Sequence, residues 1–159
     1  MSLVTIGMSH KTASLDIREK LSLDKYESQK ILKKLHSMPL VDEAFLLSTC
    51  NRTELYIEIE DLQYVDNISD WLLRQKGLSM EDFENNIYSF SDSNVVRHAL
   101  NVASGLDSMV IGEPQILGQF KSAFINAHNA GTIGKNLDRL FQYAFSTAKE
   151  VRTDTKIGA

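Results

Sequence analysis

The stretch AFLLSTCNRTELYIEIE, residues 44–60, contains two strand-like runs and a polar segment between them. Ala44–Leu47 and Leu55–Ile59 are short and rich in apolar residues, which is typical of β-strands. Because the polar segment Ser48–Glu54 is short, we expect it to form a tight loop at one edge of a sheet. In the second run, apolar residues alternate with Tyr56 and glutamates, which predicts one buried face and one solvent-exposed face.

Similar patterns on both sides of this stretch extend the prediction to the whole chain. The order β-α-β-β-α-β, followed by three helices, predicts an α+β fold. We expect a split βαβ, ferredoxin-like antiparallel sheet of about four strands, with additional C-terminal helices. The further expected strands are Leu3–Met8 and Tyr88–Phe90, and the expected helices are residues 24–36, capped by Ser22 or Asp24, and residues 65–75, 93–102, 114–130 and 135–153.

Composition predicts a single soluble domain. The chain has 159 residues, 43% of them hydrophobic, which is enough for one sizeable core. Its formal charge of −4 excludes a global basic field of the kind that drives sequence-independent nucleic-acid binding, so any such contact must be local. Two small basic clusters are more typical of solvated helix faces, namely Lys30, Lys33 and Lys34, and Lys149, Arg152 and Lys156.

The termini and the cysteine content predict a cytoplasmic protein that does not span a membrane. No apolar run approaches the ~20 residues of a membrane helix, and the first eight residues lack the basic start of a secretory signal. A lone cysteine forms no internal disulfide and survives best in a reducing compartment. Because Lys156–Ala159 follow a long amphipathic helix without a cap, we also expect the chain to be a fragment of something longer.

Cys50 is the candidate for reactive chemistry. In a loop held by two strands its thiol is accessible, and the guanidinium of nearby Arg52 would favour the thiolate that attacks acyl carbon. The alternative is that Cys50 is a small buried hydrophobe, as most free cysteines are. The residues alone leave both interpretations open.

Two other kinds of site are not supported by the pattern. The four histidines show no metal-ligand spacing around Cys50, so we expect no metal site. The glycines at 105, 112 and 118 do not form the G-x-G-x-x-G pattern that follows a strand in dinucleotide-binding folds, so we expect no dinucleotide site.

Four long motifs together resemble the glutamyl-tRNA reductase family, and the resemblance spans nearly the whole chain. They are long and specific, which makes chance similarity a minor concern. One departure is Ser14, where the family usually has proline after the alanine. The motifs are GMSHKTA at 7–13 with Arg18-Glu19, LSTCNRTELY at 47–56, ASGLDSMVIGEPQILGQ at 103–119, and residues 140–153, which resemble the helix leading out of that family's catalytic domain.

The resemblance implies that residues 1–159 are the N-terminal catalytic domain, with about 135–159 leading toward an absent NADPH-binding domain. The family reduces glutamyl-tRNA(Glu) to glutamate-1-semialdehyde with NADPH, the first step of five-carbon tetrapyrrole (porphyrin and heme) biosynthesis. The chain would carry only the acylation half, in which Cys50 takes the glutamyl group as a thioester. The full-length protein would be a homodimer through an absent C-terminal domain, and the resemblance admits a contact with glutamate-1-semialdehyde aminotransferase.

Further residues acquire roles through the same resemblance. Arg52 would bind a carboxylate of the substrate glutamate, although a surface salt bridge with Glu54 is the structural alternative. His98 would transfer protons, the alternative being that it packs with Val95 and Val102. The role of the segment Ser9-His10-Lys11 stays open. The remaining substrate-binding residues implied by the motifs are Thr49, Asn51, Ser108, Glu113, Pro114, Gln115 and Gln119.

Two other functions compete with this interpretation. The chain could be a non-catalytic module that binds tRNA or a protein, in which case Cys50 would be unreactive. It could also be a hydrolase in which Cys50 and His98 act as nucleophile and base, which would show activity on simple esters.

Overall fold

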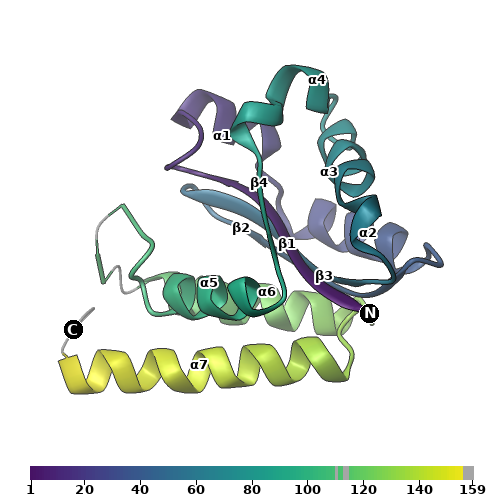
Figure 1. The fold of residues 1–159 in the computed structure, drawn as a ribbon. Coiled ribbons are helices and arrows are strands. Elements are labelled where there is room, and N and C mark those ends of the chain that lie inside the picture. The colour runs from purple at the N-terminus through teal and green to yellow at the C-terminus, as the bar shows by residue number, and fades with distance from the viewer. Residues whose placement is uncertain (110, 113–114, 156–159) are drawn as a thin grey trace.

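The computed structural model describes residues 1–109, 111–112 and 115–155 of the chain. Four strands form one antiparallel sheet in the order β2-β3-β1-β4 (Figure 1). This order, with helices connecting β1 to β2 and β3 to β4, confirms the expected α+β, split βαβ arrangement. The strands are β1 Ser2–Ser9, β2 Val41–Ser48, β3 Arg52–Ile59 and β4 Tyr88–Ser91.

The five helices expected from the sequence are present, together with short ones that the apolar pattern does not reveal. Asp24, one of the two expected caps, forms a capping box with Glu27 at the start of α2. Within the described residues, no helix has both the length and the apolar character of a bilayer-spanning segment. The helices are α1 Leu15–Leu21, α2 Lys25–His36, α3 Val65–Arg74, α4 Met80–Phe83, α5 Ser93–Ala103, α6 Gln115–Asn129 and α7 Lys135–Thr155, and short 3-10 helices lie at Leu62–Tyr64 and Glu84–Asn86.

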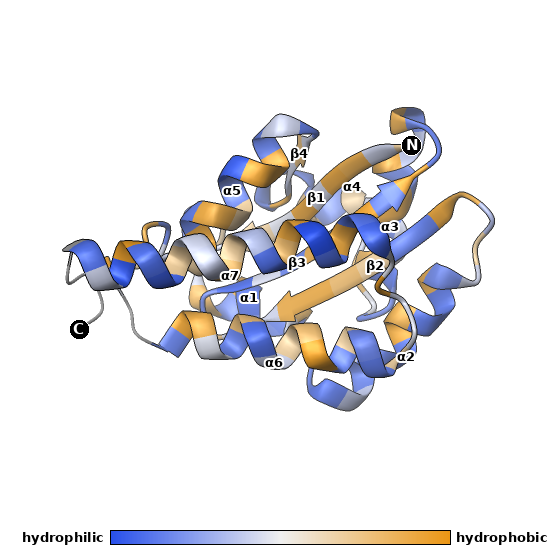
Figure 2. Ribbon diagram, turned by 90° about the horizontal axis from the view of Figure 1, so that it is seen from below, coloured by the Kyte–Doolittle hydropathy of each residue, from blue (hydrophilic) through white to orange (hydrophobic). Residues whose placement is uncertain are grey.

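Helices cover both faces of the sheet. The connecting helices α1 to α4 lie on one face, and the C-terminal helices α5, α6 and α7 lie on the other (Figure 1). Seen from the side of the three C-terminal helices, α7 runs between α5 and α6 across the strands (Figure 2). A sheet covered in this way has no solvent-exposed face at its centre.

The prediction that β3 has one solvent-exposed face is therefore wrong. Tyr56 is fully buried and Glu58 is only 7% exposed, although both alternate with the apolar residues of the strand. The Tyr56 ring packs against Phe120 of α6 and Phe141 of α7, with centroid separations of 6.1 and 5.3 Å. Aromatic packing of the C-terminal helices thus buries the face that the alternation assigned to solvent.

Buried Glu43 of β2 fixes the start of α7. Its carboxylate accepts backbone N–H groups from Gly134, Asn136 and Leu137 at 2.7, 3.1 and 2.9 Å. These are orphan donors at a helix N-terminus, where a negative charge is also favoured by the helix dipole. A Cβ on Gly134 would lie 2.7 Å from the Glu43 carboxyl carbon, so glycine is required for this close approach.

Candidate active site

Cys50 lies in the turn that joins β2 to β3. The turn contains only Thr49, Cys50 and Asn51, because β3 already begins at Arg52 and is longer than the sequence pattern predicted. The Thr49 N–H donates to the carbonyl of Arg52 at 2.7 Å, and the Asn51 N–H donates to the Thr49 hydroxyl at 3.1 Å. The Cys50 side chain is exposed at this ordered turn, so the alternative of a small buried hydrophobe is wrong.

The segment after β1 supports the turn from one side. The His10 N–H donates to the carbonyl of Asn51 at 3.0 Å. Arg18 of α1 donates from Nε to the carbonyl of Cys50 at 3.2 Å and from Nη1 to the carbonyl of Ala13 at 2.9 Å. One arginine therefore connects the first motif to the backbone of the candidate nucleophile.

Ser14, which stands where the family usually has proline, is the N-cap of α1. Its hydroxyl accepts the N–H of Ile17 at 3.4 Å. The Ser14 backbone has φ −66° and ψ 166°, and this φ is one that proline would also adopt. The departure from the motif therefore exchanges a rigid residue for a capping residue at the same φ.

Arg52 is buried at the first position of β3. Its side chain is 1% exposed, with Nη1 3.3 Å from Glu54 Oε2 and Nη2 3.0 Å from Asp107 Oδ2. Nη2 also donates to the backbone carbonyl of Asp107 at 2.6 Å, and Lys11 contacts the other carboxylate oxygen of Asp107 at 2.5 Å. Charges of alternating sign thus form a chain from Glu54 through Arg52 and Asp107 to Lys11. The salt bridge with Glu54 exists, but it is internal rather than on the surface.

Glu54 is the centre of this network and is fully buried. Its Oε2 contacts Nε2 of His98 and the Tyr88 hydroxyl, and its Oε1 accepts from the Tyr56 hydroxyl at 2.9 Å. Burial by itself would raise the pKa of Glu54, but the hydrogen bond from His98 and the positive charge of Arg52 lower it below its ordinary value. The carboxylate is therefore ionised at neutral pH and accepts hydrogen bonds from its neighbours.

Gly7 makes room for this arrangement. It lies opposite Glu54 on one side of β1 and opposite Tyr88 on the other. A Cβ at Gly7 would lie 2.8 Å from Glu54 Cγ and 3.0 Å from the Tyr88 hydroxyl.

Burial and then the Glu54 charge raise the pKa values of Tyr56 and Tyr88, so both hydroxyls stay protonated and act as donors.

His98 lies on α5 and contacts aromatic rings of β4, in addition to its position on the same helix face as the buried Val95 and Val102. Its ring centroid is 4.8 Å from that of Phe90 and 5.7 Å from that of Tyr88, and its side chain is 11% exposed. Across the residues that the structure describes, the Cys50 thiol has no hydrogen-bond partner, while Nε2 of His98 is bound to Glu54. A role for His98 in proton transfer stays a prediction.

His10 contributes a second ring at the same end of the sheet. Its Nδ1 is buried and, among the described residues, has no hydrogen-bond partner. Burial and then the positive charge of Arg52 lower the pKa of His10, so its ring is neutral at neutral pH.

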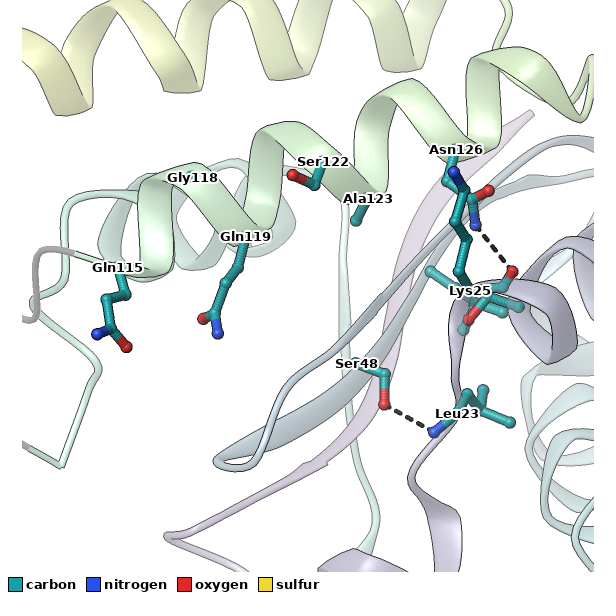
Figure 3. Close-up of a pocket in the computed structure, with 11 residues that line it drawn as sticks. Leu23, Lys25, Ser48, Gln115, Gly118, Gln119, Ser122, Ala123 and Asn126 are labelled. Atoms are coloured by element: carbon teal, nitrogen blue, oxygen red, sulfur yellow. Dashed lines mark hydrogen bonds between the residues drawn. The ribbon is translucent and has the colours of Figure 1, made fainter.

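A pocket of about 670 Å³ lies between α2 and α6 beside the end of β2. Gln115 and Gln119 line it from one face of α6, as their spacing predicts, and Ser48 lines it two residues before Cys50. Figure 3 shows both glutamine side chains extending from α6 on the side of the helix that faces Ser48. The other lining residues are Leu23, Lys25, Ser28, Leu46, Gly118, Ser122, Ala123 and Asn126.

The structure thus separates the predicted site residues into groups. Thr49, Cys50 and Asn51 form the turn, and Arg52 and His98 belong to the buried network. Ser108 follows Asp107 on the loop that Arg52 anchors. Gln115 and Gln119 line the pocket, whereas the predicted residues Glu113 and Pro114 lie outside the described residues.

Sequence reasoning missed most partners in the network. Glu54 could have been predicted as a partner of Arg52. It lies two residues after Arg52, and side chains two residues apart in a strand point to the same face of the sheet. Asp107 belongs to the third motif, but nothing local shows that it meets Arg52, which is 55 positions away in the chain. Tyr88 is likewise brought to Glu54 only by the sheet register.

Comparison with known proteins gives concordant results. The family model described as "Glutamyl-tRNAGlu reductase, N-terminal domain" matches residues 6–155. The chain is 50% identical over 159 residues to the glutamyl-tRNA reductase of Shewanella frigidimarina and 50% identical over 158 residues to that of Pseudomonas syringae pv. syringae. It covers 100% and 99% of itself in these alignments but only 38% and 37% of the relatives, so it spans less than two fifths of their length.

A solved structure shares the fold. The glutamyl-tRNA reductase from Methanopyrus kandleri superposes with a TM-score of 0.78 at 29% sequence identity. The similarity covers 96% of this chain and 34% of that one.

Proposed function

Because the chain belongs to the family of glutamyl-tRNA reductase N-terminal domains, we propose that it performs the acylation half of the reduction of glutamyl-tRNA(Glu) to glutamate-1-semialdehyde. The observation that carries the proposal is the exposed thiol of Cys50 on a turn held by His10 and Arg18. This turn leaves the thiol accessible to a large substrate. The buried network beside the turn supplies charged side chains that can bind a glutamyl carboxylate.

The proposed step is the exchange of an ester for a thioester. The Cys50 thiolate attacks the carbonyl carbon of the glutamyl ester, so a C–S bond forms and the bond from that carbon to the ribose oxygen breaks. The ribose oxygen takes up a proton, so the tRNA leaves with a free hydroxyl group. This proton balances the one that the thiol lost when it formed the thiolate. A thioester carbonyl is less resonance-stabilised than an ester, which makes it the better acceptor for a subsequent hydride.

Arg52 and Lys11 supply the positive charge that suits a glutamyl carboxylate. They already bind the carboxylate of Asp107, and Arg52 also binds its backbone carbonyl. A guanidinium offers several donors in a planar fork, so a substrate carboxylate would share these cations with Asp107 or replace it. Ser108, Thr49 and Asn51 would contact the rest of the glutamyl group from the adjoining loop and turn.

NADPH supplies the hydride in the reaction of the whole family, but the described part of the chain does not fit a dinucleotide. Its strands are all antiparallel, and no glycine-rich turn connects a described strand directly to a helix N-terminus. We therefore derive only the acylation step for these residues, with slow hydrolysis of the thioester as its expected end. Homodimerisation and a contact with the aminotransferase stay predictions for the longer protein.

The experiment that tests the proposal is the trapping of a glutamyl adduct. Radiolabelled glutamyl-tRNA is mixed with the protein, and the acid-stable label on protein is measured over time for the unmodified chain and for Cys50→Ser. We expect label on the unmodified chain that is released by hydroxylamine and is absent from Cys50→Ser. Equal label on Cys50→Ser, which has no thiol, would contradict the proposal, as would tight tRNA binding without any label on the unmodified chain.

A further inference from the structure

We propose that the solvent-exposed face of α2 binds the single-stranded 3′ end of the tRNA, with lysines on its phosphates and Tyr26 stacked on a base. The inference rests on the proposed function and deepens it, because it assigns a surface to the part of the substrate that does not react. The sequence pattern alone favours a solvated helix face here, whereas the position of the helix and an exposed ring favour an RNA contact. This α2 basic face consists of Lys25, Tyr26, Lys30, Lys33 and Lys34, all of them exposed.

The α2 basic face begins beside the candidate nucleophile. The N–H of Leu23, just before the helix, donates to the Ser48 hydroxyl at 3.0 Å. Ser48 lies two residues before Cys50, a separation that an extended chain spans in at most about 7 Å. Figure 3 shows Leu23 and Lys25 next to Ser48, where α2 starts. The first lysine of the face is therefore close to the turn that carries the thiol.

From this point α2 leads away from the turn. The carbonyl of Met38, just past the helix, accepts the N–H of Val41 at 3.1 Å, and Val41 is at the opposite end of β2 from Ser48. Between Lys25 and Lys34 the helix rises about 13 Å, at about 1.5 Å per residue. The 3′ end of a tRNA is single-stranded and carries the acyl group on its last nucleotide. With that group at the thiol, the preceding phosphates can follow the lysines along α2.

The positive charge of the face is not cancelled by acidic residues of the same helix. Helix α2 contains four lysines and one acidic residue, Glu27, whose Oε2 is 2.8 Å from Nζ of Lys76. The carboxylate of Asp24, the N-cap, accepts the N–H of Glu27 at 2.7 Å. Because the whole chain has a net charge of −4, a basic face of this kind is a local feature. Lysines in such a face can replace the counterions of a nucleic-acid backbone.

Tyr26 is the second, independent observation. It is 72% exposed, the largest exposed fraction among the large hydrophobic residues that the structure describes. Nζ of Lys30 lies 5.5 Å from the centroid of the Tyr26 ring, and Lys33 is seven residues further along on the same side of the helix. Proteins that bind single-stranded nucleic acids combine cations that follow the backbone with aromatic rings on which bases stack. An acidic protein partner would need the lysines but not the ring.

Binding of tRNA across a range of salt concentrations is the first test. Uncharged tRNA(Glu) is titrated with the protein by fluorescence anisotropy, and Lys30, Lys33 and Lys34 are changed together to Gln. Lys25 is kept because it also lines the pocket between α2 and α6. We expect the affinity of this triple variant to fall at least about tenfold at low salt. The slope of log affinity against log salt should decrease by about 2, because each phosphate contact on a single strand contributes about 0.7.

The control removes the same charge from a different surface. Helix α7 lies on the other face of the sheet (Figure 1), and its exposed cations should not contact the tRNA end. We expect its triple variant to bind tRNA within about twofold of the unmodified chain. The control substitutions are Lys135→Gln, Arg139→Gln and Lys149→Gln.

The stacking contact is tested at Tyr26. We expect Tyr26→Ser to weaken binding at least about fivefold and Tyr26→Phe to retain it, because stacking requires the ring and not the hydroxyl. The effect of Tyr26→Ser should vanish with tRNA that lacks its unpaired 3′ nucleotides. Tyr143→Ser, which removes a 58% exposed ring from α7, is the matched control.

Several outcomes would overturn the proposal. Equal losses in the α2 and α7 triple variants would assign binding to the overall charge of the protein. A Tyr26→Ser effect that persists with the truncated tRNA would assign the face to another part of the tRNA. Displacement of tRNA by polyglutamate, with full binding by Tyr26→Ser, would assign it to an acidic protein. Circular dichroism checks the fold of each variant, and Lys33→Gln, with an expected slope change of about 0.7, replaces a triple variant that does not fold.

Acylation rates separate this proposal from the proposed function. Cys50 is acylated with glutamyl-tRNA(Glu) below saturation and with glutamyl methyl ester. We expect the α2 triple variant to lower the first rate at least about tenfold and to leave the second unchanged. An unchanged rate with glutamyl-tRNA would overturn the surface assignment and leave the proposed function intact. Binding of tRNA that depends on the α2 basic face, without acylation by either ester, would contradict the proposed function and support the surface assignment.

Discussion

The ring of His98 on α5 contacts the buried carboxylate of Glu54 on β3 through Nε2, at a sequence separation of 44 residues. Because the pKa of Glu54 is lowered, the carboxylate is ionised and Nε2 carries the donated proton. In a neutral ring the other nitrogen, Nδ1, is then the acceptor. Glu54 therefore fixes the tautomer of His98 in the manner of a positioning carboxylate.

We predict that Glu54→Gln destabilises the protein strongly. Removing this charge leaves the buried guanidinium of Arg52 with Asp107 alone, and breaking a buried ion pair costs about 3 kcal/mol of unfolding free energy. Urea unfolding followed by circular dichroism measures the loss. Asp70→Asn, which breaks the exposed pair with Arg74, is the control and should cost much less, because solvent screens an exposed ion pair. Equal effects of the two substitutions would show that the Glu54 network is not stabilising.

The acid stability of the protein should depend on Asp107. Burial opposes ionisation of Asp107, but the Lys11 hydrogen bond and the Arg52 charge lower its pKa below the ordinary value. A carboxyl group with a lowered folded pKa contributes stability above its ordinary pKa, near about 4, and this contribution is lost as the pH falls through the folded pKa. We expect the melting temperature of Asp107→Asn to fall less steeply below about pH 4 than that of the unmodified chain. Parallel curves for the two proteins would contradict this.

Two of the five tyrosines should resist ionisation in the folded protein. Burial and the Glu54 charge raise the pKa values of Tyr56 and Tyr88, while Tyr26, Tyr64 and Tyr143 are exposed. Alkaline titration followed by tyrosinate absorbance should therefore show partial ionisation near pH 10, about the ordinary tyrosine pKa, and completion only upon unfolding. Their raised folded pKa values contribute stability below the ordinary pKa that is lost at more alkaline pH. Full reversible ionisation in one step, with the fold intact, would refute the prediction.

Alanine at two glycines should have effects of opposite sign. Gly7→Ala places a methyl group 2.8 Å from Glu54 Cγ and should destabilise by about 1–3 kcal/mol through overpacking. Gly118→Ala meets no atom within 4 Å and should stabilise α6 by about 0.5–1 kcal/mol. Thermal unfolding of the two variants side by side tests both statements. Stabilisation by Gly7→Ala would mean that Glu54 and Tyr88 do not pack around Gly7.

The strands and long helices could be predicted because their signals are local. Asp24 and Glu27 mark the start of α2, and Gln115 and Gln119 share a face of α6 by spacing alone. The short helices α1 and α4 were missed because a few residues show too little apolar periodicity. The exposed face assigned to β3 was wrong because alternation shows which residues differ in polarity and does not show what covers them.

The sequence by itself determined the order of the strands and long helices, the family motifs and the position of Cys50 in a turn between two strands. Only the tertiary structure decided that Arg52 pairs with Glu54 and Asp107, that His98 contacts Glu54, and that a pocket opens beside Ser48. The physical reason is the separation along the chain between the residues that interact. Strand alternation and helix periodicity are set by neighbouring residues, whereas ion pairs and pockets depend on strand register and on helices that pack from distant parts of the chain.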